Sequence, residues 1–318
     1  MGKVKYTSKI REEKLDDDMN KELLIEQINQ FKKEKNAIIL AHVYQDPAIQ
    51  DIADFIGDSL ALSKKAVDAD ADLIVFCGVK FMAETAHILN PSKTVLLPSY
   101  DAGCGLADMA TFEKLKQEKR KYPDAAVVSY VNSSAEIKAA SDICCTSSNA
   151  VDIVNALKQD TILFLPDKNL GSYIAEQSDK QIILWDGYCY VHQNITPQHI
   201  KQLKKQHPDA EVIVHPECPK KVRHLSDFIG GTGPMTSYAK QSTSNEFIVG
   251  TEDNFVYRLQ SVNPDKTFYS VQTQCEGMRK SSLVDVKQSL AKEQYRISID
   301  ENIRKKAYKA LDNMMKLS

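Results

Sequence analysis

Short apolar runs rich in β-branched residues recur along the chain, and each is followed by a polar stretch and then a helical pattern. Three such segments match one another, at residues 38–60, 126–148 and 212–234. A continuous apolar run of this length predicts a strand buried on both faces of a parallel sheet. Each run ends in two polar residues one position apart, which therefore point to the same face. These pairs are His42 with Tyr44, Tyr130 with Asn132, and His215 with Glu217.

The spacing after the polar pairs also repeats. An aspartate follows ten residues after the second polar position, and a hydroxyl side chain follows after fifteen. The aspartates are Asp54, Asp142 and Asp227, and the hydroxyl residues are Ser59, Ser147 and Thr232. A helical pattern lies between the polar pair and the hydroxyl residue, as in Ile49, Ile52, Ala53 and Ile56. We therefore predict strand, loop and helix, with the hydroxyl just before the next helix and the aspartate in a capping or orienting role.

The second half of each repeat, which follows these segments, contributes two further strands, a helix between them and a cysteine. The second strands are expected in ADLIVFCG, TILFLPD and NEFIVGTED, and the third in TVLLPS, QIILWDG and TFYSVQ. Directly after the third strands come Cys104, Cys189 and Cys275, whose separations are 85 and 86 residues. The polar pairs are separated by 88 and 85 residues, so two independent features share one period. The chain is thus predicted to contain three β-α-β-α-β repeats.

Strands alternating with helices indicate the α/β class with parallel sheets. We expect three homologous three-layer α/β/α domains around a pseudo-threefold axis, with the active site at the centre. The expected boundaries are 1–105 with 290–318, then 106–190, then 191–289, where a helix over 21–35 leads into the first domain and the C-terminal helical stretch packs back on it. Ligands of open α/β sheets bind beyond the carboxyl ends of the strands, where all the repeated polar residues lie.

Composition and charge exclude several kinds of partner. The 318 residues include 41 basic and 43 acidic side chains, so no basic field favours nucleic acid or an anionic membrane. No apolar run reaches the length of a membrane span, and the charged first twenty residues are not a secretory signal. These features predict a cytoplasmic protein. Its seven cysteines are then thiols rather than a disulfide framework.

The three repeated cysteines are the strongest chemical signal. Three thiolates at one site suit an iron–sulfur cluster, or zinc with a fourth ligand such as His192. The alternative is that these cysteines are small buried core residues without a ligand. A cluster with three protein ligands leaves one iron free to act as a Lewis acid. For the cysteines without counterparts in the other repeats we expect buried core positions, with a redox role for the Cys144–Cys145 pair left open. They are Cys77, Cys144, Cys145 and Cys218.

The polar residues at the strand ends are candidates for proton transfer and anion binding. His42, His192, His215 and Glu217 can exchange protons near neutral pH, and Tyr44 and Tyr130 can donate to a developing oxyanion. Ser59, Ser147 and Thr232 can hold a carboxylate or phosphate near helix N-termini, or simply cap helices. The glycines of 230–233 favour anion binding in the third repeat. No phosphate loop of the Walker type and no dinucleotide fingerprint is present.

Ten motifs in this order resemble the quinolinate synthase family, and they span about 39–277. They are AHVYQ, ADFIGDSL, GVKFMAETA, SYVNSSAEIKAASD, CTSSNA, LFLPDKNLG, HPEC, GGTGPM, GTEDNFVYRL and NPDKTF. The resemblance implies condensation of iminoaspartate with dihydroxyacetone phosphate to quinolinate, with loss of phosphate and water. It also implies a [4Fe–4S] cluster on Cys104, Cys189 and Cys275. The implied partners are these small substrates, an enzyme that supplies iminoaspartate, and the iron–sulfur assembly machinery.

Family site positions fall on residues that the repeat had mostly selected already. The resemblance implies that Tyr44, His42, His215, Glu217 and His192 are catalytic. It implies substrate binding by His42, Ser59, Tyr130, Asn132, Ser147, His215, Glu217 and Thr232.

Two alternatives use the same cysteines. One is a zinc-dependent hydrolase with His192 as a further ligand, and the other is a non-catalytic iron–sulfur sensor. The many polar groups at the strand ends argue against the sensor. A radical-SAM enzyme is disfavoured because C-x-x-x-C-x-x-C is absent.

Overall fold

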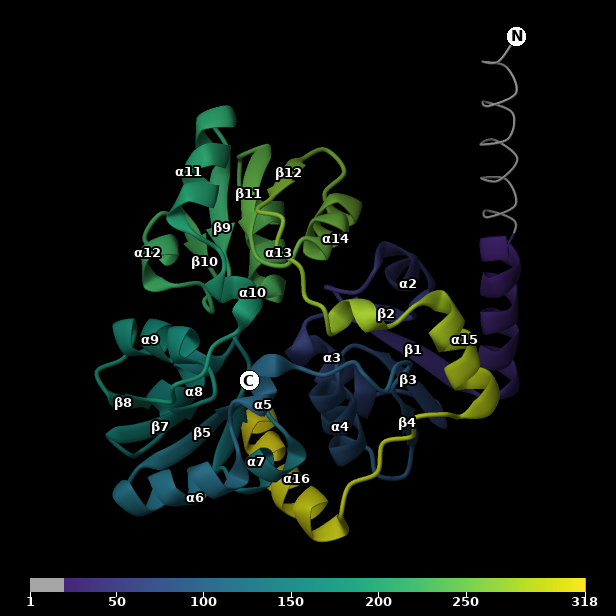
Figure 1. Cartoon of the computed structure of the whole chain (residues 1–318), viewed down its shortest axis with the longest axis horizontal. Helices are drawn as coiled ribbons and strands as arrows, with labels where there is room; N and C mark the ends of the chain where they lie inside the picture. The colour runs from purple at the N-terminus through teal and green to yellow at the C-terminus, as the bar shows by residue number, and fades with distance from the viewer. Residues whose placement is uncertain (1–19, 318) are drawn as a thin grey trace.

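Three parallel sheets make up the framework of the molecule. The computed structural model describes residues 20–317. Within this range the strands form three four-stranded sheets with the same order: β2-β1-β3-β4, β6-β5-β7-β8 and β10-β9-β11-β12. All pairings within them are parallel. Figure 1 shows the three units as separate groups of elements arranged around a common centre. The predicted α/β class with three homologous units is confirmed.

The first unit follows a helix that covers residues 20–34 in the described part of the chain. Its elements are β1 (Ala37–His42), α2 (Pro47–Ile52), β2 (Phe55–Gly57), α3 (Ser59–Val67), β3 (Leu73–Cys77), α4 (Lys80–Leu89) and β4 (Thr94–Leu96).

The second unit begins with two helices and then repeats the same order. Its elements are α5 (Gly105–Asp108), α6 (Phe112–Lys121), β5 (Ala126–Tyr130), α7 (Ala135–Ala139), β6 (Ile143–Cys145), α8 (Ala150–Ala156), β7 (Thr161–Leu165), α9 (Lys168–Glu176) and β8 (Gln181–Leu184).

The third unit and the C-terminal helices complete the described chain. They comprise α10 (Tyr190–Gln193), α11 (Pro197–Gln206), β9 (Glu211–Val214), α12 (Lys220–Arg223), β10 (Phe228–Ile229), α13 (Thr232–Gln241), β11 (Glu246–Gly250), α14 (Asn254–Val262), β12 (Thr267–Ser270), the 3₁₀ helix η1 (Met278–Lys280), α15 (Leu283–Lys292) and α16 (Glu301–Lys316).

Each sheet buries both faces, as the continuous apolar strands predict. In β3, Ile74 and Phe76 join the large core shared by all three units, while Val75 and Cys77 join a separate core beneath α15. The second and third units have outer cores of the same kind. One face of every sheet therefore contributes, with its helices, to the interior of the whole molecule, and the other face is covered by outer helices.

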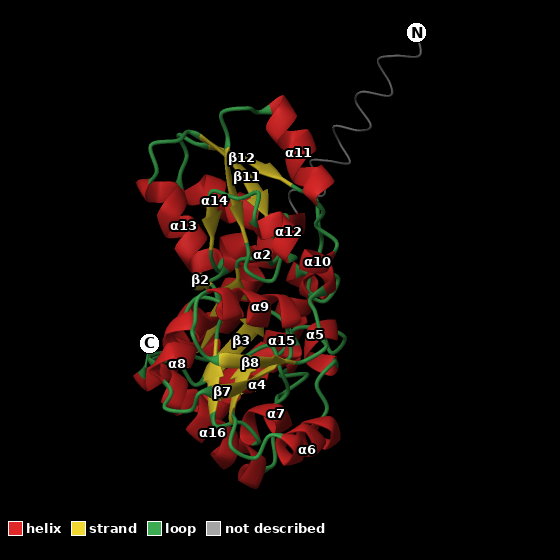
Figure 2. Ribbon diagram, turned by 90° about the vertical axis from the view of Figure 1, so that its left-hand side faces the viewer, coloured by secondary structure: helices red, strands yellow, loops and turns green. Residues whose placement is uncertain are grey.

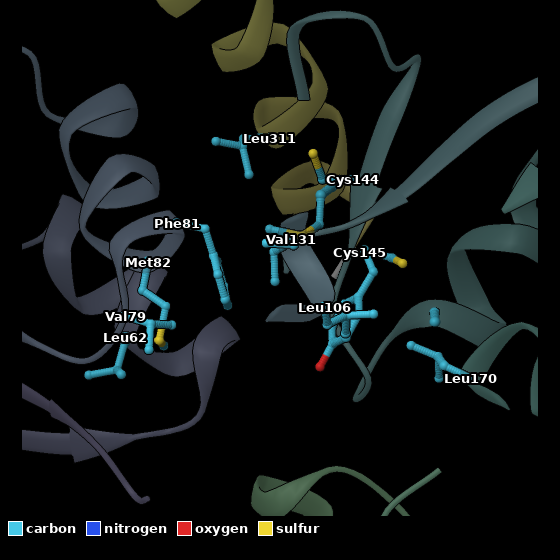
Figure 3. Close-up of a cluster of buried hydrophobic side chains, with 14 of the residues drawn as sticks. Leu62, Val79, Phe81, Met82, Leu106, Val131, Cys144, Cys145, Leu170 and Leu311 are labelled. Carbon is cyan, nitrogen blue, oxygen red and sulfur yellow. The ribbon is translucent and has the colours of Figure 1, made fainter. Parts of the chain in front are cut away.

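The shared core joins units that are distant in sequence. Figure 3 shows Phe81 of α4 lying toward Val131, with Leu311 of α16 nearby, and the same core contains Cys144 and Cys145 of β6. In Figure 2 the third unit lies above the other two, so the carboxyl ends of its strands meet theirs near the middle. Because this core is continuous, the relative positions of the three units are fixed by packing.

One feature of each predicted repeat was wrong. The repeat contains four strands rather than three, because a short edge strand follows the first helix: β2, β6 and β10. Ile56, assigned to a helical pattern, lies in β2, and α2 ends at Ile52. These edge strands have only two or three residues, too few to give a pattern of their own.

The three repeated aspartates hold these edge strands against the central strands. The carboxylates of Asp54, Asp142 and Asp227 accept a backbone N–H from the central strand at 2.7, 2.8 and 2.8 Å. The backbone N–H of each aspartate donates in return to the carbonyl of the same strand residue. Their predicted orienting role is thereby confirmed.

The C-terminal segment contacts two units. Helix α15 packs on β3, and Arg296 bridges to Leu96 of β4, both in the first unit. Helix α16 packs on α7 and β6 of the second unit as well as on α4 of the first. The C-terminal segment thus packs on the first unit, as expected, and also on the second. The predicted domain boundaries stay a prediction. Residues 1–19 and 318, which these boundaries include, lie outside the described residues.

No helix among the described residues is long and apolar enough to span a bilayer.

Candidate active site

Every residue predicted to be catalytic, to bind substrate or to hold the metal lines one cavity between the three units. The strands of three sheets end there, so side chains that are far apart in sequence converge. The lining includes His42, Tyr44, Ser59, Cys104, Tyr130, Asn132, Ser147, Cys189, His192, His215, Glu217, Thr232 and Cys275. The predicted meeting of strand ends at one site is thus observed, while the role of each side chain stays a prediction.

The three cavity cysteines have the same local structure. Each precedes a short helix, and each Sγ accepts backbone N–H groups from that helix. The donors are Leu106 and Ala107 for Cys104, His192 for Cys189, and Gly277 and Met278 for Cys275. Burial raises the pKa of all three thiols, that of Cys104 to about 12. Backbone donors aimed at sulfur counteract this effect and stabilise a bound thiolate.

The loops that carry these cysteines touch one another. A Cβ atom on Gly277 would collide with the carbonyl oxygen of Gly103, so glycine is required where the Cys275 loop passes the Cys104 loop. Tyr190, directly after Cys189, accepts the backbone N–H of Glu276 at 2.7 Å and hydrogen-bonds Cys275 through its hydroxyl. The three loops thus form one continuous wall of the cavity.

The remaining four cysteines are core residues, as expected. Cys77, Cys144, Cys145 and Cys218 are free thiols with no exposed surface. Burial raises the pKa of each of them, so their thiols stay protonated.

Two histidines at equivalent strand ends have the same tautomer. Nδ1 of His42 accepts the backbone N–H of Tyr44 at 3.1 Å, and Nδ1 of His215 accepts that of Glu217 at 3.3 Å. Burial lowers the pKa of both imidazoles to about 3, so they are neutral. With Nδ1 occupied as an acceptor, the proton of each ring is on Nε2. Both rings therefore present an Nε2–H donor, and that of His215 lies 3.2 Å from Oγ of Ser147.

A hydrogen-bonded chain of four side chains runs through the buried end of the site. The hydroxyl of Tyr44 lies 2.5 Å from Oγ1 of Thr251, which lies 2.8 Å from Nε2 of His192. Nδ1 of the same ring lies 2.8 Å from Oε2 of Glu217. With an ionised Glu217 at one end, the donors run from Tyr44 to Thr251 and on to Nε2 of His192, and the protonated Nδ1 of that ring faces the carboxylate.

The Glu217 carboxylate interacts with several members of this polar cluster. Burial opposes its ionisation, but the neighbouring imidazoles and the hydrogen bonds from His192 and Tyr130 outweigh burial and hold its pKa below the usual range. The Tyr130 hydroxyl also bonds Ser147. Burial, reinforced by the negative charge of Glu217, raises the pKa of Tyr130 and Tyr44, so both phenols keep their protons and act as donors.

The hydroxyl residues surround the other end of the cavity. Ser59 and Thr232 are the first residues of α3 and α13, and Ser147 lies three residues before α8. Free N–H groups at these helix starts suit a carboxylate or phosphate. The Oδ1 atom of Asn132 is buried and has no hydrogen-bond partner within the described residues, so it can accept from a bound molecule.

One glycine of the run at 230–233 is required by a contact between units. A Cβ atom on Gly231 would lie 2.5 Å from Oγ of Ser148 and 2.8 Å from Oγ of Ser147. The glycine thus lets the third unit approach the second. In the same region Oγ of Ser148 donates to Asp58 of the first unit at 3.0 Å. The predicted anion-binding role of this run stays a prediction.

Three functional positions escaped the sequence analysis. Thr251 follows β11, and its counterparts Gly78 and Pro166 are not polar, so the repeat gives no signal. Asp167 and Glu252 are equivalent to each other, and the third counterpart is Val79. Because two of the three repeats have an acid at this position, a comparison of the repeats could have identified Asp167 and Glu252.

The donor set can hold a metal. Ligand atoms of Cys189, His192 and Glu217 lie within 4.8 Å of one another. The cavity also offers the soft Sγ donors of Cys104 and Cys275, and soft thiolates select iron–sulfur clusters or zinc.

Comparisons with known proteins agree with this site. Residues 26–316 match the family model described as quinolinate synthetase A protein. Quinolinate synthase of Clostridium acetobutylicum is 54% identical over 295 residues, which cover 92% of this chain and 97% of the relative. That of Alkaliphilus metalliredigens is 49% identical, covering 94% of this chain and all of the relative.

An archaeal relative, quinolinate synthase 2 of Methanosarcina acetivorans, is also 49% identical, over 94% of this chain and 97% of its own length. These relatives give no support to the zinc-dependent hydrolase. Because the match covers all three sheets and every cavity residue, the chain belongs to the quinolinate synthase family.

Proposed function

We propose that this chain is a quinolinate synthase, which condenses iminoaspartate with dihydroxyacetone phosphate and releases phosphate and water. The observation that carries the proposal is the single cavity at which three equivalent cysteines meet the acid–base and hydroxyl groups of all three units. The family membership supplies the reaction, and the cavity supplies side chains suited to each part of it.

The cofactor of the proposed enzyme is a [4Fe–4S] cluster held by Cys104, Cys189 and Cys275. The fit rests on three cavity thiols, each with backbone N–H donors at sulfur, a feature that tunes and stabilises iron–sulfur clusters. When bound, the cluster supplies Lewis acidity through the iron that has no protein ligand.

The polar residues bind and orient the substrates. Ser59, Ser147 and Thr232 hold carboxylate or phosphate oxygens, and Tyr130 and the orphan oxygen of Asn132 contact the remaining polar groups. The neutral rings of His42 and His215 donate from Nε2 to substrate oxygens without adding charge.

Proton transfer is assigned to the chain that ends at Glu217. Tyr44 accepts a substrate proton at the cavity while its own phenolic proton passes through Thr251 to Nε2 of His192. The Glu217 carboxylate stabilises the His192 imidazolium that this transfer creates.

The expected setting follows from the same proposal. The protein works in the cytoplasm, receives iminoaspartate from the enzyme that makes it, and obtains its cluster from the iron–sulfur assembly machinery. Neither nucleic acid nor membrane is a partner.

The test is metal and sulfide analysis of anaerobically purified protein, together with turnover of the two substrates. Four irons and four sulfides per chain and quinolinate formation are expected. Cys104→Ala should lose both, whereas Cys77→Ala, which removes a buried core thiol outside the cavity, should keep both. Zinc without sulfide, or a Cys104→Ala protein with full iron and turnover, would contradict the proposal.

A further inference from the structure

Two buried carboxylates outside the predicted site lie directly behind two of the cavity cysteines. Asp167 and Glu252 have no exposed surface, and each lies two residues after the third strand of its unit, β7 or β11. A buried acid needs several hydrogen bonds to be tolerated, so its partners show what it holds in place.

Asp167 joins the start of α9 to the backbone of Cys189. Its Oδ1 accepts the N–H groups of Asn169 and Leu170, both at 2.8 Å, and so caps the helix. Its Oδ2 accepts the N–H of Cys189 at 2.9 Å. Both oxygens are used, one for the helix and one for the cysteine.

Glu252 does the same in the third unit. Its Oε2 accepts the N–H of Asn254 at the start of α14 at 2.8 Å, and its Oε1 accepts the N–H of Cys275 at 3.4 Å. The guanidinium of Arg279 reaches Oε1 at 3.3 Å from the far side of the Cys275 loop. Glu252 therefore holds this loop at two points.

The backbone shows that these two acids are structurally equivalent. In each unit, the residue after this position donates its N–H to the carbonyl two residues before the cavity cysteine. The pairs are Lys80 to Ala102, Lys168 to Gly187, and Asp253 to Thr273, at 2.8, 2.8 and 2.9 Å. The first unit has Val79 at the position of the acids, so no such carboxylate holds Cys104.

We propose that Asp167 and Glu252 are positioning residues that hold Cys189 and Cys275 in the orientation needed to bind the cluster, an inference that rests on the proposed cofactor. Each carboxylate connects a cysteine loop to a helix anchored on its sheet, so the Sγ atom is fixed before the metal arrives. Among the described residues, Val79 stands at the equivalent position beside Cys104 and offers no carboxylate. Partners behind the ligands of a metal site commonly control its affinity.

The test compares Asp167→Asn and Glu252→Gln with wild-type protein after anaerobic cluster loading. An amide of nearly the same shape keeps one acceptor oxygen, but its NH₂ cannot accept from an N–H group. The bond to the helix or to the cysteine is therefore lost. We expect iron to leave for an external chelator about 10- to 100-fold faster, with a changed electron paramagnetic resonance spectrum of the reduced cluster.

Two kinds of control separate positioning from charge and from stability. Asp186→Asn and Glu276→Gln remove exposed acids close in sequence to the same cysteines and should leave iron loss unchanged. Asp142→Ala removes a strand contact without touching any of the three cavity cysteines, and so reports what destabilisation alone does.

Iron loss at the wild-type rate in both variants, or equal acceleration in Asp142→Ala, would overturn the inference. If Asp167→Asn does not fold, Glu252→Gln decides the question by the same measurement. Wild-type protein that takes up no iron and sulfide would instead overturn the proposed function, and this inference with it.

Discussion

At the scale of single residues, the repeat identified most of the site. His42, His215 and Glu217 were found because equivalent strand ends carry polar pairs, and the structure places them at one cavity. Thr251 was missed because its hydroxyl has no counterpart in the other units. A comparison of repeats cannot identify a residue whose side-chain type occurs in only one of the units.

Thr251 connects Tyr44 to His192, so replacing it tests the proton path. Thr251→Val keeps the shape but removes the hydroxyl, which leaves two buried groups without their partner. We expect steady-state turnover to fall about 100-fold or more, as when general acid–base catalysis is lost. Thr251→Ser keeps the hydroxyl and should stay close to wild type. Equal loss in both variants would rule out a role for the hydroxyl.

The two strand-end histidines should be neutral throughout the physiological range. Because burial lowers the pKa of His42 and His215 to about 3, they take up a proton only as the pH falls toward that value. Nitrogen NMR of iron-free, histidine-labelled protein should therefore show the Nε2–H tautomer, unchanged between pH 5.5 and 8, about where an ordinary histidine titrates. The signals are assigned with His42→Asn and His215→Asn. A titration midpoint near pH 6.5 would contradict the assigned tautomers.

At the scale of elements, apolar runs predicted three of the four strands of every unit and the helix before the last of them. The short strands β2, β6 and β10 were missed, because two or three residues show no periodicity. What holds those strands is the aspartate at each of their starts. The sequence showed these aspartates as a repeat, and only the structure shows that they bond the adjacent strand.

Asp142 tests the contribution of this contact to stability. Asp142→Ala removes a carboxylate that accepts from Val127 at 2.8 Å, and should lower the free energy of unfolding by about 1.5–3 kcal/mol. Chemical denaturation of the iron-free protein measures the change. Asp142→Asn keeps an acceptor oxygen and should lose less; equal stability of Asp142→Ala and wild type would show that the contact contributes nothing.

At the scale of the whole molecule, the arrangement of units around one cavity was predictable because ligand sites of α/β sheets lie beyond the strand ends. The contacts between units were not. Arg223 of α12 is an example: its side chain is fully buried and reaches the carbonyl of Asn169 at 3.1 Å and Glu176 at 2.9 Å, both in the second unit. The equivalent positions in the other units, Gln50 and Lys138, are also buried and polar, but three different side chains form no motif that a comparison of the repeats would show.

Arg223 should therefore hold the second and third units together. Arg223→Met leaves the carbonyls of Asn169 and Cys218 without this donor and removes one partner of Glu176, and should cost about 1–3 kcal/mol in chemical denaturation, as expected for buried acceptors left unsatisfied. Lys220→Met is the matched control, because Lys220 lies 3.2 Å from the same carboxylate but is 58% exposed. A similarly small effect of both substitutions would contradict a structural role for Arg223.

The central claim is that three cysteines hold a cluster whose fourth iron is left for substrate. Anaerobic Mössbauer spectroscopy of iron-reconstituted protein, with and without quinolinate, tests it most directly. The account predicts that one iron site of the four changes its spectrum when quinolinate is added, while the three iron sites bound by Cys104, Cys189 and Cys275 stay the same. Four unchanged sites would contradict it.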